Sequence, residues 1–200
     1  MANTTGKKIK DAAIIGGCAS LIYLTIGDIS YRLSLSRGGL NSKLITDMVA
    51  KSAAKKPKNE YKEKLDSMID DGADWFMHQD TEKIIIEKKH RQSLYADLIR
   101  PDKPSNVYII CIHGYTSSPA NMGIYAKKYH ELGYNVLLPS LRGHGDSEQD
   151  FITMGWNDRL DVIEWINYIA ERHPESKIIL HGVSMGAATT MMATGEKLPE

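Results

Sequence analysis

The stretch that most constrains the fold is residues 178–188, Ile-Ile-Leu-His-Gly-Val-Ser-Met-Gly-Ala-Ala. Its aliphatic start predicts a strand, and the small residues at its end suit the first turn of a helix. Between them lies Gly-x-Ser-x-Gly, in the strand–turn–helix context that is typical of a nucleophile elbow. Gly182 and Gly186 fit positions where strand and helix nearly touch and a side chain would collide. We therefore predict that Ser184 is a nucleophile, the alternative being an ordinary Gly/Ser turn.

The segments before this stretch alternate between predicted strands and helices. Aliphatic and β-branched runs predict strands at 83–87, 93–99, 107–112, 134–139 and 178–180, and helical periodicity predicts helices at 122–132 and 156–172. Strands that alternate with helices favour βαβ crossovers, hence an α/β fold with a mostly parallel sheet and helices on both faces. The uninterrupted apolar run 107–112 is expected of a strand buried on both faces, with Cys111 an inert buried thiol. In the second helix, the expected buried side consists of Leu160, Ile163, Ile166 and Ile169.

Polar residues follow three of these strands. In open parallel sheets, ligands bind outside the carboxyl ends of the strands, so we expect His113, Arg142 and Ser184 to share one rim. A serine hydroxyl needs a base that removes its proton, and N–H donors for the oxyanion that forms. The backbone N–H groups of Met185 and Tyr115 are the expected donors. We expect His113 to orient its loop and not to act as the base.

The N-terminus carries a short uncharged segment. Three lysines precede 16 uncharged residues, 12–27, which are bounded by Asp11 and Asp28. As a helix this segment would reach about 24 Å, somewhat less than a bilayer core of about 30 Å. The leading interpretation is a membrane anchor whose orientation stays open, because basic residues also follow the segment. A cleaved signal peptide, a lipoprotein-type signal at Cys18 and a buried or interfacial helix are the alternatives.

Composition adds few constraints. Residues 40–75 read as two amphipathic helices, interrupted by a basic run at 55–58 that we interpret as a solvated linker. Lys plus Arg and Asp plus Glu are balanced at 25 each, so no long-range field favours nucleic acid as a partner. The two cysteines lie far apart in the sequence and suggest neither a disulfide framework nor a metal site.

Three motifs together resemble a known family. They are His-Gly-Tyr-Thr-Ser-Ser at 113–118, Leu-Arg-Gly-His-Gly-Asp-Ser at 141–147 and Gly-Val-Ser-Met-Gly at 182–186. With these motifs in order, each after a strand, residues 81–200 resemble the first part of an α/β-hydrolase of the serine-aminopeptidase-like type. The nearest resemblance is to bacterial, membrane-anchored members described as cell-surface hydrolases. By this resemblance residues 1–30 form the basic stretch and anchor, 31–80 a helical lead-in and 81–200 the N-terminal portion of the hydrolase domain.

The resemblance implies a chemistry and a location. The chemistry is hydrolysis of a small acyl ester, amide, thioester or peptide through an acyl-serine, with no metal or organic cofactor. The location is the bacterial cell membrane, with the hydrolase domain outside the cytoplasm. The resemblance also implies structural roles for His144 and Asp146.

The pattern after Ser184 departs from the family. There the triad runs Ser, then Asp or Glu, then His, but residues 185–200 contain neither Asp nor His. All seven histidines lie upstream, and His181 sits within or at the end of the strand that leads to the serine. We therefore expect a fragment that has a nucleophile and an oxyanion hole but no base, and that is inactive alone. A catalytically silent, membrane-tethered binding module and one half of a split enzyme are the alternatives.

Overall fold

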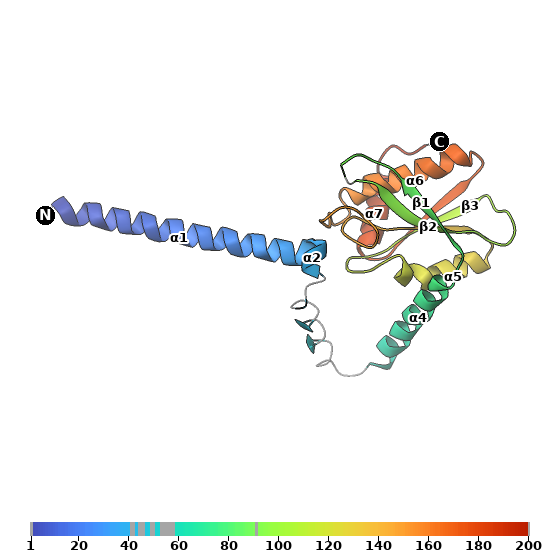
Figure 1. Cartoon of the computed structure of the whole chain (residues 1–200), viewed down its shortest axis with the longest axis horizontal. Helices are drawn as coiled ribbons and strands as arrows, with labels where there is room; N and C mark the ends of the chain where they lie inside the picture. Colours follow the sequence, from blue (N-terminus) through green and yellow to red (C-terminus); the bar gives the residue numbers. More distant parts are fainter. Residues whose placement is uncertain are drawn as a thin grey trace.

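The structure is a computed structural model that describes residues 2–40, 43, 47–48, 51–52, 59–90 and 92–199. Figure 1 shows a long helix that leads to a sheet covered by helices. In chain order the elements are α1 (Ala2–Leu35), α2 (Arg37–Leu40), α4 (Glu60–Met77), β1 (Thr81–Ile86), β2 (Leu94–Ile99), β3 (Val107–Ile112), the 3₁₀ turn η1 (Ala120–Met122), α5 (Gly123–Glu131), β4 (Asn135–Pro139), α6 (Asp158–Arg172), β5 (Lys177–Gly182) and α7 (Met185–Thr194). Of the two helices expected within 40–75, the first falls mostly outside the described residues and the second is α4.

The five strands form one mixed sheet in the order β1-β2-β4-β3-β5. The three C-terminal strands are parallel, with β3 between β4 and β5. The N-terminal hairpin β1–β2 is antiparallel and joins the sheet through an antiparallel pairing of β2 with β4. Because β3, β4 and β5 are parallel, the loops that follow their carboxyl ends meet at one edge of the sheet. The predicted strand 107–112 is confirmed over its full length as β3.

Helices cover both faces of the sheet. Ile110 of β3 lies in a core cluster with Trp165 of α6, on one face. Ile109 and Cys111 lie in a second cluster with Phe76 of α4, on the other face. Neighbouring residues of a strand point to opposite faces, so β3 is buried on both sides as predicted. Burial raises the pKa of the Cys111 thiol to about 12, in agreement with an inert buried thiol.

Helix α6 begins later than the sequence predicted, and of its expected buried side Ile166 and Ile169 are buried and Ile163 is partly buried, whereas Leu160 is not. The expected start was residue 156, but α6 starts at Asp158, and Leu160, predicted to be buried, is 45% exposed. The fully buried Asp158 carboxylate accepts hydrogen bonds from the Gly155 N–H at 3.0 Å and the Thr153 hydroxyl at 2.6 Å. This carboxylate holds the preceding residues in a turn, so the helix starts only at the residue that provides it.

Helix α4 meets the domain through its second half alone. The sequence predicts an apolar face of Tyr61, Leu65, Met68 and Ile69 for this helix; the first three are exposed and Ile69 is half-buried. Closer to the C-terminus, Gly72 faces the backbone of α5, where a Cβ on Gly72 would lie 2.3 Å from the nitrogen of Ile124. The two helices therefore cross in backbone-to-backbone contact at this glycine.

Helix α1 extends away from the sheet, at the left of Figure 1, and contacts the domain only near its C-terminal end. Apolar side chains along it are exposed, among them Leu21, Ile22 and Leu24. Arg32 and Asp28 form an ion pair at 2.8 Å on the same helix. Within the residues that the structure describes, we find no helix with the length and apolarity needed to cross a membrane, so the predicted transmembrane span is not supported.

Candidate active site

Ser184 occupies a strained turn between β5 and α7. Its φ is 54° and its ψ is −117°, a conformation that L-residues with a side chain rarely adopt. A Cβ on Gly182 would lie 2.2 Å from the Gly186 carbonyl oxygen, and a Cβ on Gly186 would lie 2.1 Å from the Ile112 carbonyl oxygen. Both positions therefore require glycine, and the packing around them imposes the turn. Ser184 itself is exposed, so this is the geometry expected of a nucleophile elbow.

The loop after β3 lies directly beside this serine. A Cβ on Gly114 would lie 3.3 Å from Cβ and 3.8 Å from Oγ of Ser184. In the part of the chain that the structure describes, the backbone N–H groups of Tyr115 and Met185 donate to no acceptor. Met185 is also the first residue of α7, where the helix dipole adds positive potential. Two unused donors thus flank the elbow, on the loop and at the helix start.

Two buried histidines connect the loop after β3 to the loop after β4. His113 Nδ1 donates to the Gly114 carbonyl at 2.9 Å, and its Nε2 accepts the Leu141 N–H at 3.1 Å. His144, from the second loop, donates from Nδ1 to the carbonyl of the preceding Arg142 at 2.9 Å and accepts the Thr116 N–H on Nε2 at 3.2 Å. Each imidazole therefore receives an N–H from the other loop, and both bonds require a neutral ring.

Burial favours this neutral state. Desolvation lowers the pKa of His113 from 6.5 to about 4 and also lowers that of His144. The rings contact each other edge to face, with centroids 4.9 Å apart. These histidines join the two loops, and neither is hydrogen-bonded to Ser184.

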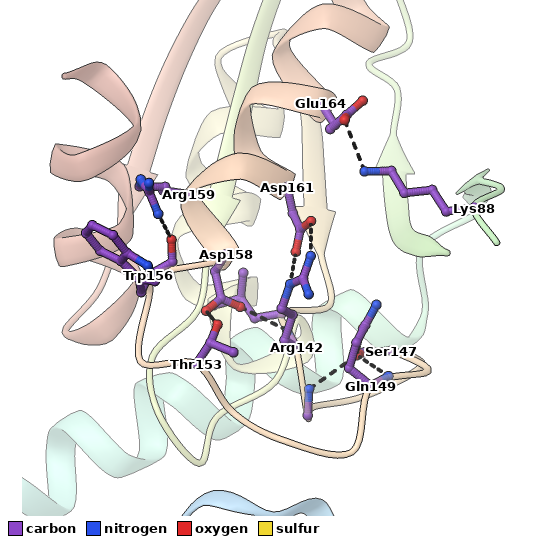
Figure 2. A network of polar contacts seen from close by, with 12 residues as sticks. Lys88, Arg142, Ser147, Gln149, Thr153, Trp156, Asp158, Arg159, Asp161 and Glu164 are labelled. Carbon is purple, nitrogen blue, oxygen red and sulfur yellow. Dashed lines mark hydrogen bonds and ion pairs between the residues drawn. The ribbon is translucent and has the colours of Figure 1, made fainter. Parts of the chain in front are cut away.

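Arg142 follows β4 at the predicted rim, but its guanidinium does not serve the site. Figure 2 shows its guanidinium turned toward α6, where Nε and Nη2 bind the two carboxylate oxygens of Asp161 at 2.7 and 2.8 Å. Its backbone N–H donates to Asp158 Oδ1 at 3.0 Å. The charge of Arg142 is therefore used to hold the loop after β4 on α6. Asp146 of the same loop pairs with Lys83 of β1 at 3.1 Å.

The segment that contains Ser34 and Arg37 contacts the loops of the site, although no sequence motif marks it. The Tyr115 phenol donates to the carbonyl of Ser34, which lies at the end of α1. The Arg37 guanidinium donates to the carbonyls of Ser147 and His144 in the loop after β4. These contacts carry no sequence signal, because all three acceptors, in Ser34, His144 and Ser147, are backbone carbonyls that any residue could supply.

The structure brings no histidine to Ser184. His181 lies in β5, where Nδ1 bonds the Tyr129 hydroxyl at 2.7 Å. All seven histidines are among the described residues, and none of them hydrogen-bonds the Ser184 hydroxyl. Across the described part of the chain, no group of three or more His, Cys, Asp or Glu side chains is placed to hold a metal ion. The described residues thus place an exposed serine hydroxyl beside two unused backbone N–H donors, with no histidine hydrogen-bonded to it.

Comparisons with known proteins identify the fold and the family pattern. Residues 103–200 match the model of the family described as serine aminopeptidase, S33. A thermostable monoacylglycerol lipase of Bacillus sp. (strain H-257) is 31% identical over 90 residues, which are 42% of this chain and 34% of the lipase. The uncharacterized protein YqkD of Bacillus subtilis is 29% identical over 121 residues, which are 60% of this chain and 39% of that protein.

Solved structures agree. The Pyrococcus furiosus esterase Pf2001 superposes with a TM-score of 0.54 and 28% identity, over 61% of this chain and 48% of the esterase. An α/β serine hydrolase of Xanthomonas campestris, XC6422, has a TM-score of 0.50 and 18% identity over 57% of this chain and 56% of its own, which supports the fold alone. The chain spans between a third and two fifths of the curated relatives it matches. Residues 103–200 thus combine the serine aminopeptidase S33 pattern with an α/β-hydrolase fold.

Proposed function

We propose that this chain, with its serine-aminopeptidase-type α/β-hydrolase portion, contributes the nucleophile and oxyanion hole of a serine hydrolase. The observation that carries the proposal is the exposed, strained Ser184, with the loop after β3 packed against it. Strain at a single non-glycine residue persists only where the surroundings impose it, which is typical of functional sites. The bond cleaved is a carboxylic ester, amide or thioester. Similarity to a lipase and an esterase favours the ester among these three.

The reaction follows from the positions of the groups. Ser184 Oγ attacks the acyl carbon while a general base takes the hydroxyl proton, and the carbonyl oxygen becomes an oxyanion. The N–H groups of Met185 and Tyr115 donate to this oxyanion, and the proton then passes to the leaving group as the acyl-serine forms. Water attacks the acyl-serine by the same route in reverse and releases the acid and the free serine.

The base and its acid partner are proposed to lie outside these 200 residues. His113 and His144, in the loops after β3 and β4, and His181, on the strand that leads to Ser184, each have another hydrogen-bond partner. Residues 185–200 offer no Asp and no His. On this proposal residues 1–200 alone have no turnover, and the base comes from further sequence of the same protein or from a second polypeptide. A silent, tethered binding module is the candidate from another class.

We also propose that α1 attaches the protein to a lipid surface. Support comes from Leu21, Ile22 and Leu24 of this helix, which are 67%, 59% and 66% exposed. Burial of such side chains in a lipid interface contributes about 25 cal/mol for each Å² of apolar surface.

The test of the reaction uses the protein at its native length. We expect it to hydrolyse p-nitrophenyl esters and to react with a fluorophosphonate probe, and Ser184→Ala to abolish both. Ser176→Ala, at the opposite end of β5, is the matched control and keeps both. Turnover that survives Ser184→Ala would refute the nucleophile. A native protein that neither hydrolyses esters nor binds the probe would favour the silent module.

A further inference from the structure

Residues 34–37, called the link below, comprise the end of α1, Ser36 and the start of α2, and they lie against two loops of the proposed site. Ser36 forms an isolated antiparallel bridge with Phe151. Beside it, the Ile152 N–H donates to the Leu35 carbonyl at 2.7 Å, and the Arg37 N–H donates to the Asp150 carbonyl at 2.9 Å. Backbone hydrogen bonds on both sides of the bridge therefore fix the position of this link. A fixed link can restrain the side chains that bond to it.

Its first contact with the site is Tyr115. The phenol hydroxyl donates to the Ser34 carbonyl, and the ring packs with Leu35 against the core cluster that contains Met185. The backbone N–H of the same tyrosine is the proposed oxyanion donor on this loop. A side chain held at its far end restricts the rotation of the peptide that carries it. The link thus acts directly on the residue whose amide must point at the oxyanion.

Its second contact acts through His144. Arg37 donates from its guanidinium to the His144 carbonyl, and the His144 ring accepts the Thr116 N–H at 3.2 Å. Thr116 has a φ of 57°, a left-handed conformation that is unfavourable for a β-branched residue. Such a residue keeps its conformation only while its surroundings hold it. This bond therefore helps to hold the turn at 115–116, together with the Ser117 N–H, which donates to the Gly114 carbonyl at 3.2 Å.

We propose that residues 34–37 position the oxyanion loop, with Ser34 and Arg37 as positioning residues for the Tyr115 amide. The inference rests on the proposed function, because it assigns a role within that reaction. The two contacts act on neighbouring residues of the loop. Ser34 contacts Tyr115 directly, and Arg37 reaches Thr116 through His144. Since the link continues α1, the N-terminal helix becomes part of the machinery that keeps the site in its active geometry.

Tyr115→Phe is the decisive variant, because it keeps the ring and the amide and removes only the phenolic donor. Loss of an oxyanion donor lowers kcat by about a hundredfold or more, and a donor that is only misdirected should lower it by about tenfold. We expect this fall in kcat with KM changed by less than about twofold, since the donor acts mainly in the transition state. The matched control is Tyr95→Phe, which removes a phenol bonded to Glu148 at 3.1 Å and should leave kcat unchanged.

Arg37 gives an independent variant. We expect Arg37→Gln to lower kcat, and Arg37→Lys to restore part of it because a lysine can still donate to a carbonyl. Arg32→Gln, on exposed α1, removes the same charge without touching the loops and should have no effect. Hydrogen exchange of the peptide that contains residues 113–118, followed by mass spectrometry, should be faster in Tyr115→Phe and Arg37→Gln than in the controls.

The outcomes separate the two proposals. Full kcat in Tyr115→Phe and Arg37→Gln would overturn the positioning role and leave the serine hydrolase intact. A native protein without esterase activity would refute the proposed function, and exchange of residues 113–118 would then decide the positioning role. Unchanged exchange in both variants overturns that role, and faster exchange supports it.

Discussion

Acid should weaken this fold through one buried imidazole. His113 is fully buried and uses Nε2 to accept the Leu141 N–H, a bond that a protonated ring cannot make. Its pKa falls from 6.5 to about 4 on folding, chiefly because burial removes the ring from water. Between pH 6.5 and about 4 the His113 ring is therefore protonated in the unfolded chain and neutral in the folded chain. The free energy of unfolding should therefore fall as the pH drops from 6.5 toward 4. Above pH 6.5 the ring is neutral in both states, so His113 no longer lowers the stability.

The magnitude follows from the two pKa values. At about pH 5 the unfolded imidazole is mostly protonated and the folded one mostly neutral, which costs about 2 kcal/mol relative to pH 7.5. Because His144 shifts in the same direction, the total loss should be larger. Urea unfolding followed by circular dichroism at the two pH values measures the difference.

Non-titrating variants isolate the contribution of one ring. His113→Gln keeps an acceptor near Leu141 and removes the titration, so its loss between the two pH values should be about 2 kcal/mol smaller than that of the wild type. His90→Gln removes an exposed imidazole and should retain the wild-type difference. A His113→Gln protein with the same pH dependence as the wild type, or an NMR titration of His113 centred near 6.5, would refute the reasoning.

Three further predictions concern the elbow, the loop after β4 and the N-terminal helix. Ser184→Gly should be about 1 kcal/mol more stable than Ser184→Ala in urea unfolding, because glycine relieves the backbone strain that alanine retains; equal stabilities would show that the turn stores no strain. Arg142→Gln should cost about 3–5 kcal/mol, since it leaves Asp161 buried without its partner, whereas Arg100→Gln, in a half-exposed ion pair, should cost less than about 1 kcal/mol; equal losses would contradict the burial argument. Leu24→Ser should reduce sedimentation with phosphatidylglycerol vesicles, and unchanged sedimentation would argue against attachment through α1.

The parts of the fold that sequence predicted are those where local pattern and burial coincide. Strand β3 has an apolar residue at every position because both of its faces are covered, so its bounds could be read from the run itself. The elbow is similar, because Gly182 and Gly186 are required by contacts with backbone atoms of adjoining elements. Sequence therefore located the proposed nucleophile without knowledge of the sheet order.

The sequence did not predict the direction in which individual side chains point. A strand end places the backbone of Arg142 at the rim, but the direction of its guanidinium depends on Asp161, a full turn into α6. The same buried cluster explains the late start of that helix, since Asp158 caps the preceding turn instead of continuing a helix from residue 156. The antiparallel hairpin β1–β2 also gave no local sign of pairing with β4. The direction of the Arg142 guanidinium and the pairing of β2 with β4 are set by partners remote along the chain, whereas the start of α6 is set by side-chain hydrogen bonds within five residues.

The elbow around Ser184 and the oxyanion loop after β3 are held by different kinds of contact. The elbow is defined by β3, β5 and α7, whose contacts are close-packed and independent of the N-terminal helix. The oxyanion loop instead depends on His113, His144 and the link at residues 34–37, through single hydrogen bonds between segments far apart in sequence. A perturbation that leaves the core folded, such as mild acid or displacement of α1, should therefore misdirect the Tyr115 donor before it disturbs Ser184. Reactivity of the serine toward a small probe and turnover of an ester would then decline separately, with turnover the more sensitive of the two.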